Sequence, residues 1–523
     1  MEQSNRNQLP SGWTWTSIDQ LIGQEGLFVD GDWVESKDQD PSGSVRLIQL
    51  ADIGECFFKD QSDRHLTYEK AKELDCTFLK KGDVLISRLP DPLGRACLFP
   101  LEGEESFVTA VDVSIVRLDA SVHPKWFIYV FNSPSVRSQI NKYKTGTTRG
   151  RISRKNLKKV NLPLPPAPEQ QRIVAKLEEL FSELDDSVAN LEAARARLQT
   201  YRQSLLKHAF EGRLTEQWRR DHADELESAD QLLERIREER QARYQQQLED
   251  WKTQVAQWEA DGKPGKKPRK PTAAKAPEAL EQEALLALPP TWEWVRLGEL
   301  FDGKPVNGLY KPASSYGKGY GIIRIDDFYD GVIRSKGEFR MVDVTDSEAE
   351  PYIIRDGDIL VNRVNSIEYL GKIGLARKEH EGMLFESNMM RIRLTSAVGP
   401  VGFFVRYLSS PDGASRLRIN AKHAVNQASI NQGDVLNVPV PLAPKGEQQE
   451  ILDRLEAGLS MVEEIENTIE SSLKRNKTLR QSILKRAFEG WLVSQDPNDE
   501  PASELLARIQ GAEQKVQERG ERA

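Results

Sequence analysis

The sequence predicts an α+β fold: two mixed α/β globules separated by two long antiparallel coiled-coil helices, with an internal pseudo-twofold repeat. Three observations predict this fold. The chain has 523 residues, more than one hydrophobic core normally holds. The segment "RQSLLKHAFEGRL" (Arg202–Leu214) returns as "RQSILKRAFEGWL" (Arg480–Leu492), with ten of thirteen positions identical. Each copy ends a long stretch in which apolar residues recur at heptad spacing.

Other blocks recur in the same order in both halves of the chain. The pairs are "LPSGWTWTSIDQL" and "LPPTWEWVRLGEL", "VRLIQLADIG" and "GIIRIDDFYDG", "KKGDVLISR" and "IRDGDILVNR", and "NLPLPPAPEQQRI" and "NVPVPLAPKGEQQEI". Two copies indicate a duplicated unit, because a solenoid array would need more repeats.

The repeat divides the chain into six expected segments. They are a first globule at 1–165, a first coiled-coil helix at 166–215, a helical insert with a basic Pro-rich linker at 216–287, a second globule at 288–443, a second coiled-coil helix at 444–492, and a polar C-terminal tail with a short helix at 493–523.

Each globule shows short β-branched runs bounded by Gly-Asp turns, such as "GDVLIS" and "GDILVN". This pattern is typical of strands in a mixed α/β domain. The stretches "LPLPPAP" and "VPVPLAP" then end each globule, because proline cannot donate to a sheet ladder and favours extended backbone before it.

The two helices are expected from about Glu169 to Glu211 and from Glu447 to Glu489. The main seam position holds Leu177, Leu184, Leu191, Leu198 and Leu205 in the first helix and Leu455, Val462, Ile469, Asn476 and Ile483 in the second. The other seam position holds Ile173, Leu180, Ala194 and Tyr201, and then Ile451, Ile465 and Leu479. A single Asn at such a position fixes register. An ordinary amphipathic core helix is the alternative interpretation.

Charge predicts how the helices pair. The range 169–192 carries seven acidic and two basic residues, and 195–213 carries five basic and one acidic. The second helix repeats this gradient, with eight acidic and one basic residue in 447–470 and six basic and no acidic residues in 474–486. An antiparallel pair sets acid beside base, so we expect an antiparallel rod with one globule at each end.

The insert begins with a charged, helical pattern over Glu216–Trp258. The stretch Gly262–Lys275 follows, with six basic residues, no acidic residue and three prolines. We expect a flexible linker that returns the chain to the second unit, with contact between its lysines and nucleic acid as a less favoured alternative.

Composition excludes several classes of protein. The three cysteines, Cys56, Cys76 and Cys97, lie far apart without a C-x-x-C motif, which predicts reduced thiols in a cytoplasmic protein and no zinc site. No apolar run is long enough to span a membrane, and the N-terminus lacks a signal core. The chain has no phosphate-binding loop, no dinucleotide fingerprint and no paired histidines. We therefore expect no catalytic residues, no bound metal and no cofactor on this chain.

One loop of the first globule predicts contact with nucleic acid. The range 137–159 carries nine Lys or Arg and no Asp or Glu. Its centre, "TGTTRGR", contains Arg149 and Arg151 among small residues. Glycine allows close approach to phosphate, and arginine can read guanine in the major groove. A solvated basic loop is the alternative.

The corresponding loop of the second globule, 416–435, is less basic. It offers Lys422, His423, Asn426 and Gln427, and Asn and Gln pair naturally with adenine. The two loops differ where base contacts would lie, which fits two readers of different sequences. Arg88 and Arg363 end matching strands and are further candidates, with a structural salt bridge as the alternative for each.

The duplicated α/β unit, Pro-rich exit, "E-Q-Q" start and helix ending in "Q-S-[IL]-L-K-x-A-F-E-G" resemble the specificity subunit of type I restriction–modification systems. The resemblance implies two target recognition domains that read the halves of a bipartite, asymmetric double-stranded DNA site. It also implies that the helices set the gap between the half-sites, and that the subunit does no chemistry. The implied partners are two methyltransferase subunits and two restriction subunits in a phage-defence complex. S-adenosylmethionine, ATP and Mg are implied for those partners.

The family's DNA-facing loops map onto Thr145–Arg154 and Lys422–Ser429. The expected DNA-binding residues are Arg88, Lys144, Thr145, Gly146, Thr147, Thr148, Arg149, Arg151, Ser153, Arg154, Arg363, Lys422, His423, Asn426, Gln427 and Ser429. Two other functions stay open from the sequence alone: a coiled-coil scaffold with duplicated protein-binding heads, and a self-contained restriction or modification enzyme.

Overall fold

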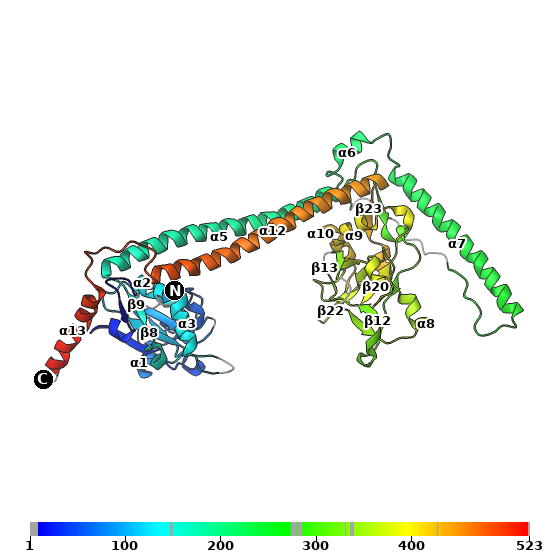
Figure 1. The fold of residues 1–523 in the computed structure, drawn as a ribbon. Coiled ribbons are helices and arrows are strands. Elements are labelled where there is room, and N and C mark those ends of the chain that lie inside the picture. The colour runs from blue at the N-terminus through cyan, green and yellow to red at the C-terminus, as the bar shows by residue number, and fades with distance from the viewer. Residues whose placement is uncertain are drawn as a thin grey trace, which may run out of the picture. The chain divides into compact units, whose positions relative to one another are not determined.

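The structure, a computed structural model, describes residues 9–90, 92–146, 150–272, 280, 285–329, 331–334, 339–425 and 427–520. The chain divides into two compact units (Figure 1). Unit 1 comprises Met1–Ala193 and Ile469–Ala523, and unit 2 comprises Ala194–Thr468. Each unit therefore contains one globule and part of both long helices. Within the described ranges, no helix combines the length and the apolar character that a membrane span requires.

The globule of unit 1 is built on a four-stranded sheet of order β2-β8-β5-β6 and a three-stranded sheet of order β4-β3-β7. A two-stranded ladder, β1-β9, joins the first strand to the Pro-rich exit. The strands are β1 (Thr14–Thr16), β2 (Leu27–Asp30), β3 (Val45–Ile48), β4 (His65–Leu66), β5 (Val84–Ser87), β6 (Ala96–Leu98), β7 (Phe107–Thr109), β8 (Val113–Arg117) and β9 (Leu162–Leu164). The helices are α1 (Tyr68–Glu73), α2 (Pro124–Phe131), α3 (Pro134–Lys142) and α4 (Arg154–Leu157).

The globule of unit 2 has a six-stranded sheet of order β11-β20-β16-β18-β14-β13 and two three-stranded sheets, β15-β12-β19 and β17-β22-β21. The ladder β10-β23 corresponds to β1-β9. The strands are β10 (Glu293–Arg296), β11 (Val306–Asn307), β12 (Tyr316–Ile323), β13 (Phe328–Tyr329), β14 (Gly331–Ile333), β15 (Arg340–Val342), β16 (Ile359–Asn362), β17 (Val364–Asn365), β18 (Ile373–Leu375), β19 (Leu384–Phe385), β20 (Met389–Ile392), β21 (Lys422–Ala424), β22 (Gln427–Ser429) and β23 (Pro439–Leu442). The helices are α6 (Glu216–Asp221), α7 (Ala229–Ala260), α8 (Asp346–Ala349), α9 (Val401–Ser409), α10 (Pro411–Arg418) and α11 (Gln432–Leu436).

The two long helices are α5 (Ala167–Phe210) and α12 (Lys445–Phe488), with 44 residues each. At 1.5 Å per residue each is about 66 Å long. Gly212 and Gly490 follow the helix ends with φ of 70° and 78°. Only glycine adopts this left-handed conformation without steric cost, which is why the sequence repeats "AFEG" at both ends.

Contacts within each unit establish that α5 and α12 run antiparallel. In unit 1, Asn476 Nδ2 donates to Ser187 Oγ at 3.2 Å, and Arg480 pairs with Asp185 at 2.5 Å. In unit 2, the side chain of Leu205 lies against Gly458. Residue numbers thus rise along one helix as they fall along the other. The acid-to-base pairing predicted from the charge gradient appears in the Arg480–Asp185 pair.

Burial along the helices confirms the main seam and corrects the second one. Leu177, Leu205, Leu455, Val462, Ile469 and Ile483 are buried, and Leu184, Leu191, Leu198 and Asn476 are half-buried. Tyr201, Ile465 and Leu479 are exposed, so their predicted place in the seam is wrong. The physical reason is that a pair of helices covers one narrow stripe on each, whereas Ile173 and Ile451 gain their burial from a globule.

The internal repeat extends to individual buried interactions. Trp13 Nε1 donates to Glu169 at 2.9 Å, and Trp292 Nε1 donates to Glu447 at 2.8 Å. Arg117 forks onto Asp83 with two bonds of 2.7 Å, and Arg393 forks onto Asp358 at 2.6 and 2.7 Å. The "W-x-W", "E-Q-Q" and "G-D" blocks therefore recur because they build the same joints twice.

A further pair of repeated elements was missed from the sequence. Helix α7 begins "ADQLLERI", and α13 (Ala502–Gly520) begins "ASELLARI". In each, the Ala, both Leu and the Ile are buried in the core of their own unit. Ala229 N donates to Thr291 O at 3.1 Å, and Ala502 N donates to Gly12 O at 2.8 Å. The first turns of α7 and α13 therefore pack equivalently on their own units, and we call these two helices the docking helices. They lie in the expected insert and in the expected polar tail.

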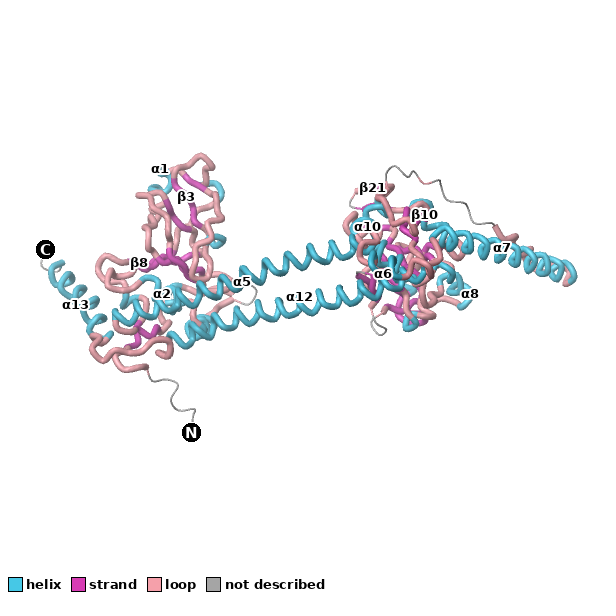
Figure 2. The backbone as a smooth tube through the Cα atoms, turned by 90° about the horizontal axis from the view of Figure 1, so that it is seen from above, coloured by secondary structure: helices cyan, strands magenta, loops and turns pink. Residues whose placement is uncertain are grey.

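The described part of the basic linker packs against α7, which extends away from the strands of unit 2 (Figures 1 and 2). Trp251 Nε1 donates to Pro268 O and Trp258 Nε1 to Pro264 O, both at 3.0 Å. Lys270 lies over the Trp251 ring at 5.8 Å, and Lys267 over the Trp258 ring at 5.9 Å. Residues 263–270 therefore make defined contacts with α7, because proline carbonyls accept from the two indoles and lysine side chains lie over their rings. Their flexibility stays a prediction.

The docking of α7 should depend on pH. Burial at the contact between α7 and β10, with the Asp230 carboxyl close by, raises the pKa of Glu293 to about 7. Since the folded state holds this proton more tightly than the unfolded state, docking should weaken as pH rises from about 5 to about 8. Glu293→Gln should remove this dependence. Amide hydrogen exchange over residues 229–236 at the two pH values, corrected for intrinsic rates, measures it.

Unit 1 supplies the matched control for this prediction. Thr14 and Ser503 occupy the positions of Glu293 and Asp230, so the docking of α13 lacks both carboxyls. Exchange over 502–509 should respond less to pH than exchange over 229–236. An equal response at both helices would contradict the assignment to Glu293.

Candidate nucleic-acid interface

The basic loop of unit 1 forms a narrow hairpin after α3. Thr145 N donates to Arg151 O at 2.9 Å, and Arg151 N donates to Thr145 O at 2.8 Å. Lys144, Thr145, Gly146 and Arg151 are exposed, as contact with DNA requires. Thr147, Thr148 and Arg149, which were predicted at its tip, lie outside the described residues.

Two residues at the end of this hairpin have structural roles. Ser153 is the N-cap of α4, and its hydroxyl accepts from Asn156 N at 3.2 Å. Arg154 is half-buried and donates to Phe28 O at 3.3 Å. Both side chains therefore have a structural contact, a helix cap for Ser153 and a bond to the sheet for Arg154, and their contact with DNA stays a prediction.

Several cations of the 137–159 run also serve the fold. Arg137 donates to Leu93 O and to Asn132 Oδ1, and burial lowers the pKa of its guanidinium. Lys158 pairs with Asp19 at 3.0 Å. The density of positive charge in the sequence therefore overstates the charge available to a ligand, which is concentrated on the hairpin and on neighbouring lysines such as Lys155.

Arg88 joins the hairpin to the main sheet of unit 1. Its guanidinium pairs with Asp30 at 2.9 Å and donates to Ile152 O and Val111 O at 3.2 and 3.0 Å. Its backbone carbonyl accepts from Ile152 N at 3.1 Å. The structural salt bridge is therefore present, and Arg88 connects the end of the hairpin to the main sheet.

The corresponding loop of unit 2 is a three-stranded sheet in which β21 and β22 form a hairpin beside β17. Lys422 pairs in register with Ser429, and His423 with Ala428. Lys422, His423 and Gln427 are exposed, Ser429 is half-buried, and Asn426 lies outside the described residues. Val425, next to the tip, is 93% exposed. Sequence reasoning passed over it because it sought polar base readers, although an apolar tip can contact a thymine methyl group.

Arg363 occupies the same junction in unit 2 as Arg88 in unit 1. Its backbone carbonyl accepts from Ile430 N at 2.9 Å, and its guanidinium donates to Ser387 O at 3.1 Å. Its backbone N donates to Asn388 O at 2.8 Å, as Arg88 N donates to Asp112 O at 2.9 Å. Asn307 stands where unit 1 has Asp30. Both arginines therefore hold a hairpin against the sheet by the same backbone connections.

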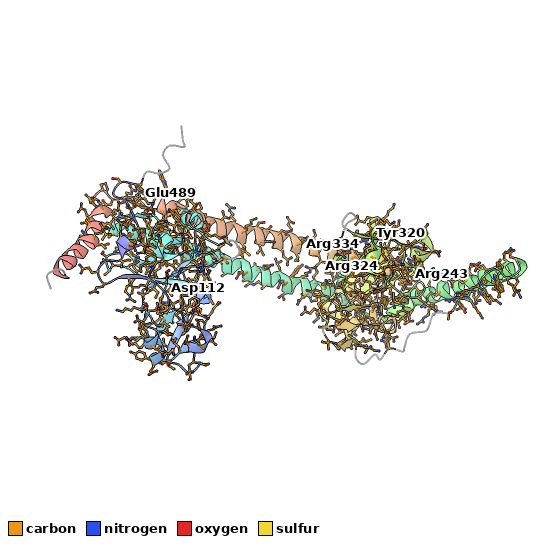
Figure 3. The ribbon with its side chains drawn as sticks, turned by 90° about the horizontal axis from the view of Figure 1, so that it is seen from below. Asp112, Arg243, Tyr320, Arg324, Arg334 and Glu489 are labelled. Carbon is orange, nitrogen blue, oxygen red and sulfur yellow. The ribbon has the colours of Figure 1, made fainter. Side chains whose placement is uncertain are left out.

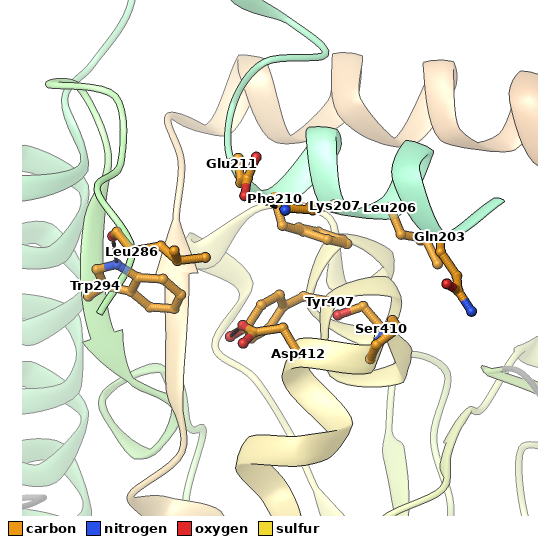
Figure 4. A pocket seen from close by; sticks show the side chains of 11 residues that line it. Gln203, Leu206, Lys207, Phe210, Glu211, Leu286, Trp294, Tyr407, Ser410 and Asp412 are labelled. Carbon is orange, nitrogen blue, oxygen red and sulfur yellow. Dashed lines mark hydrogen bonds and ion pairs between the residues drawn. The ribbon is translucent and has the colours of Figure 1, made fainter. Parts of the chain in front are cut away.

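Unit 2 also contains an apolar cavity of about 340 Å³, whose lining includes no residue of this hairpin (Figure 4). Beside it, Tyr407 donates to Asp412 at 2.8 Å, and Arg416 pairs with Asp412 at 2.9 Å. Burial raises the pKa of Tyr407. The Asp412 carboxylate is held by two donors, so the cavity does not offer a free base beside a nucleophile.

Metal and thiol chemistry have no assembled site in the described part of the chain. No group of three or more His, Cys, Asp or Glu side chains is arranged to hold a metal ion there. Cys56, Cys76 and Cys97 are free, and burial raises the pKa of each to about 12. Thiolate chemistry at neutral pH is therefore disfavoured at all three.

The fold and these junctions define a class of protein with two similar recognition domains. Each domain presents a hairpin, and each is joined to a pair of long helices. The type I restriction modification DNA specificity domain matches residues 38–193 and 289–475. The chain therefore belongs to the type I restriction modification DNA specificity family, and its role is DNA-targeting specificity.

Named relatives and a solved structure agree with this membership. The type I restriction enzyme EcoKI specificity subunit of Escherichia coli K12 is 27% identical over 383 residues, which cover 73% of this chain and 68% of the relative. The EcoAI specificity subunit of Escherichia coli is 21% identical over 514 residues, which cover 93% and 84%. A chain from a structure of the type I R-M system superposes with a TM-score of 0.62 at 19% identity, covering 92% of this chain and 99% of that chain, and shows the same fold.

Proposed function

We propose that the chain reads a bipartite DNA target, with one half-site contacted by each recognition domain. The observation that carries this proposal is the repeated junction of hairpin and arginine, Ile152 N to Arg88 O at 3.1 Å and Ile430 N to Arg363 O at 2.9 Å. The same backbone presents different side chains, Lys144 and Arg151 in one unit and Lys422 and Gln427 in the other. Two similar frames with different surfaces fit an asymmetric target.

We also propose that the chain works without chemistry of its own, within a complex of two methyltransferase and two restriction subunits. S-adenosylmethionine, ATP and Mg would be bound by those partners. The internal repeat supports the pairwise stoichiometry, because a duplicated unit presents the same docking surface twice.

The experiment that tests this function is a single-molecule methylome of the native host with and without the gene. Deletion should abolish methyl-adenine at one sequence made of two short specified halves and an unspecified gap. The missing sequence would define both half-sites together. Loss of a continuous, palindromic sequence, or no loss while the partner subunits are present and active, would contradict the proposal.

A further inference from the structure

Each globule exposes one large aromatic side chain at the same position in its fold. Trp33 follows β2 in unit 1 and is 69% exposed, and Tyr310 follows β11 in unit 2 and is 78% exposed. The surrounding sequences, "GDWVES" and "GLYKPA", share little beyond a glycine two residues before the aromatic. We name these segments the aromatic loops, Gly31–Trp33 and Gly308–Tyr310.

The aromatic loops are fixed by equivalent backbone contacts. In unit 1, Gly31 N donates to Val113 O at 2.7 Å, and Asp32 N donates to Thr109 O at 2.8 Å. In unit 2, Gly308 N donates to Met389 O at 3.0 Å, and Leu309 N donates to Phe385 O at 2.8 Å. The same parallel bridge follows in both, from Asp32 to Ala110 and from Leu309 to Glu386.

Both glycines are required by this close approach. A Cβ at Gly31 would overlap the carbonyl oxygen of Ala110, and one at Gly308 would overlap that of Glu386. The backbone is therefore pressed against the neighbouring strand, and the aromatic two residues later is held at a defined place.

The aromatic loops are continuous with the hairpin junctions. The segment 110–112 that carries the Asp32 bridge also receives the hydrogen bonds from Arg88, whose bonding partner Asp112 is labelled in Figure 3. The segment 386–388 carries the Leu309 bridge and receives the hydrogen bonds from Arg363. In each unit a run of direct backbone contacts thus links the hairpin, the arginine and the aromatic loop.

The charges beside the two rings differ: Lys and Arg side chains gather beside Tyr310, whereas Trp33 stands in a stretch with Asp32, Glu35 and Asp38, where Lys37 supplies a positive charge. Tyr310 borders a hollow of about 300 Å³ that is also lined by Lys311, Arg324, Arg340 and Glu386. Arg324, which is labelled in Figure 3, pairs with Glu386 at 3.0 Å, and Lys311 pairs with Glu348 at 3.0 Å. Trp33 Nε1 donates to Glu35 at 3.1 Å, which orients the indole, and Glu35 is itself paired with Lys37 at 2.9 Å.

A single exposed aromatic needs no explanation, because much of any protein surface is apolar. Two exposed aromatic side chains at one structural position are different. Each aromatic loop has the same glycine and the same backbone hydrogen bonds, while most of the ring surface stays exposed. The stability of the fold does not explain why backbone contacts fix the position of a ring that is mostly exposed to solvent. A ligand that covers the ring does.

We propose that Trp33 and Tyr310 contact DNA, each packing its ring against the bases or sugars of the half-site read by its own hairpin. Aromatic side chains stack on bases or wedge between base steps. Because each aromatic loop is joined to its hairpin, the ring reaches its contact only when the hairpin has docked on its own half-site. This inference rests on the proposed function, and it adds one apolar contact per half-site to the polar contacts of the hairpins.

The test uses the chain in complex with its methyltransferase partner, in the variants Trp33→Ala and Tyr310→Ala. The probes are duplexes that carry the sequence found by the methylome, with both halves intact or with one half scrambled. Trp33→Ala should weaken binding to the intact duplex by about 10- to 100-fold. It should have little effect once the first half is scrambled, and Tyr310→Ala should behave likewise for the second half. Trp33→Phe and Tyr310→Phe should restore most of the affinity.

Trp491→Ala is the matched control, because Trp491 is 73% exposed and lies outside both aromatic loops. Wild-type affinity for Trp33→Ala and Tyr310→Ala would overturn the inference, provided that the wild-type complex distinguishes intact from scrambled duplexes. If the wild-type complex does not distinguish them, the proposed function itself fails. Melting temperatures equal to wild type would show that any loss of binding comes from the ring.

Discussion

Replacing Glu447 by Ala is expected to destabilise unit 2 by about 3–5 kcal/mol. Glu447 is fully buried at the start of α12 and accepts hydrogen bonds from three side chains. Trp292 Nε1 donates at 2.8 Å, Thr215 Oγ1 at 2.6 Å and Arg219 Nε at 2.9 Å. Removing the carboxylate would leave a largely buried guanidinium and two further donors without their acceptor.

The equivalent change in unit 1, Glu169→Ala, is the matched comparison and should cost about 1–2 kcal/mol. Glu169 accepts from Trp13 Nε1 at 2.9 Å, and within the described residues its Oε1 atom has no hydrogen-bond partner. Burial raises the pKa of Glu169, so ionisation of this carboxyl works against folding as pH rises. The cost of Glu169→Ala should therefore be smaller at pH 8 than at pH 5.

Hydrogen exchange on the full chain distinguishes the two changes, because peptides from each unit report on that unit. In urea, the slowest amides of 288–443 should lose more protection in Glu447→Ala than the slowest amides of 9–165 lose in Glu169→Ala. Equal losses would show that Arg219 and Thr215 contribute nothing to the joint.

The duplicated fold could be predicted from sequence because its signals are local. Heptad spacing, the glycine after each long helix and the Gly-Asp turn before β5 and β16 each depend on a few adjacent residues. The antiparallel pairing followed from the charge gradient along α5 and α12, and Arg480 beside Asp185 realises it.

The docking helices also carry a signal in the sequence, although a weak one. "ADQLLERI" and "ASELLARI" agree at five of eight positions, at an offset of 273, but the match is short and stands apart from the longer repeated blocks. The first segment lies in the charged stretch that was expected to be an insert, and the second lies in the expected polar tail. Their helical stripe is short, so the apolar face becomes evident only when Thr291 and Gly12 are seen to accept their first N–H groups.

The position of the first hairpin could be predicted from sequence, but the contacts of its side chains could not. A run of nine cations locates the first hairpin, but sequence cannot tell that Arg137 and Arg154 point into the domain while Arg151 points out. That division is set by contacts with Leu93 and Phe28, more than 40 residues away in the chain. The aromatic loops could not be predicted from sequence for the same reason, because Gly31 contacts Ala110 only in the folded sheet.

Arg88→Ala should reduce recognition of the first half-site by about 100-fold or more while the fold persists. The change removes the cation beside Asp30 and the donors to Ile152 O and Val111 O. The backbone bond from Ile152 N to Arg88 O would remain, but the hairpin would lose the side-chain contacts that fix its orientation on the sheet, and base readout tolerates little displacement of the reading side chains. Lys cannot reproduce this fork, so Arg88→Lys should rescue only part of the loss. Lys81→Ala is a control with little expected effect, because Lys81 pairs with Glu102 on the open surface.

The diagnostic measurement for Arg88 is a double-mutant cycle that combines the substitution Arg88→Ala in the protein with scrambling of one half-site in the DNA. Binding free energies are measured for wild type and Arg88→Ala on the intact duplex, on a duplex with the first half scrambled and on one with the second half scrambled. If Arg88 acts through the first hairpin alone, its loss and scrambling of the first half should be strongly non-additive, because each removes the same contacts. Its loss and scrambling of the second half should be additive. Non-additivity with both halves would mean that Arg88 supports a surface shared by the whole target, and the assignment of one reader to each half-site would have to be abandoned.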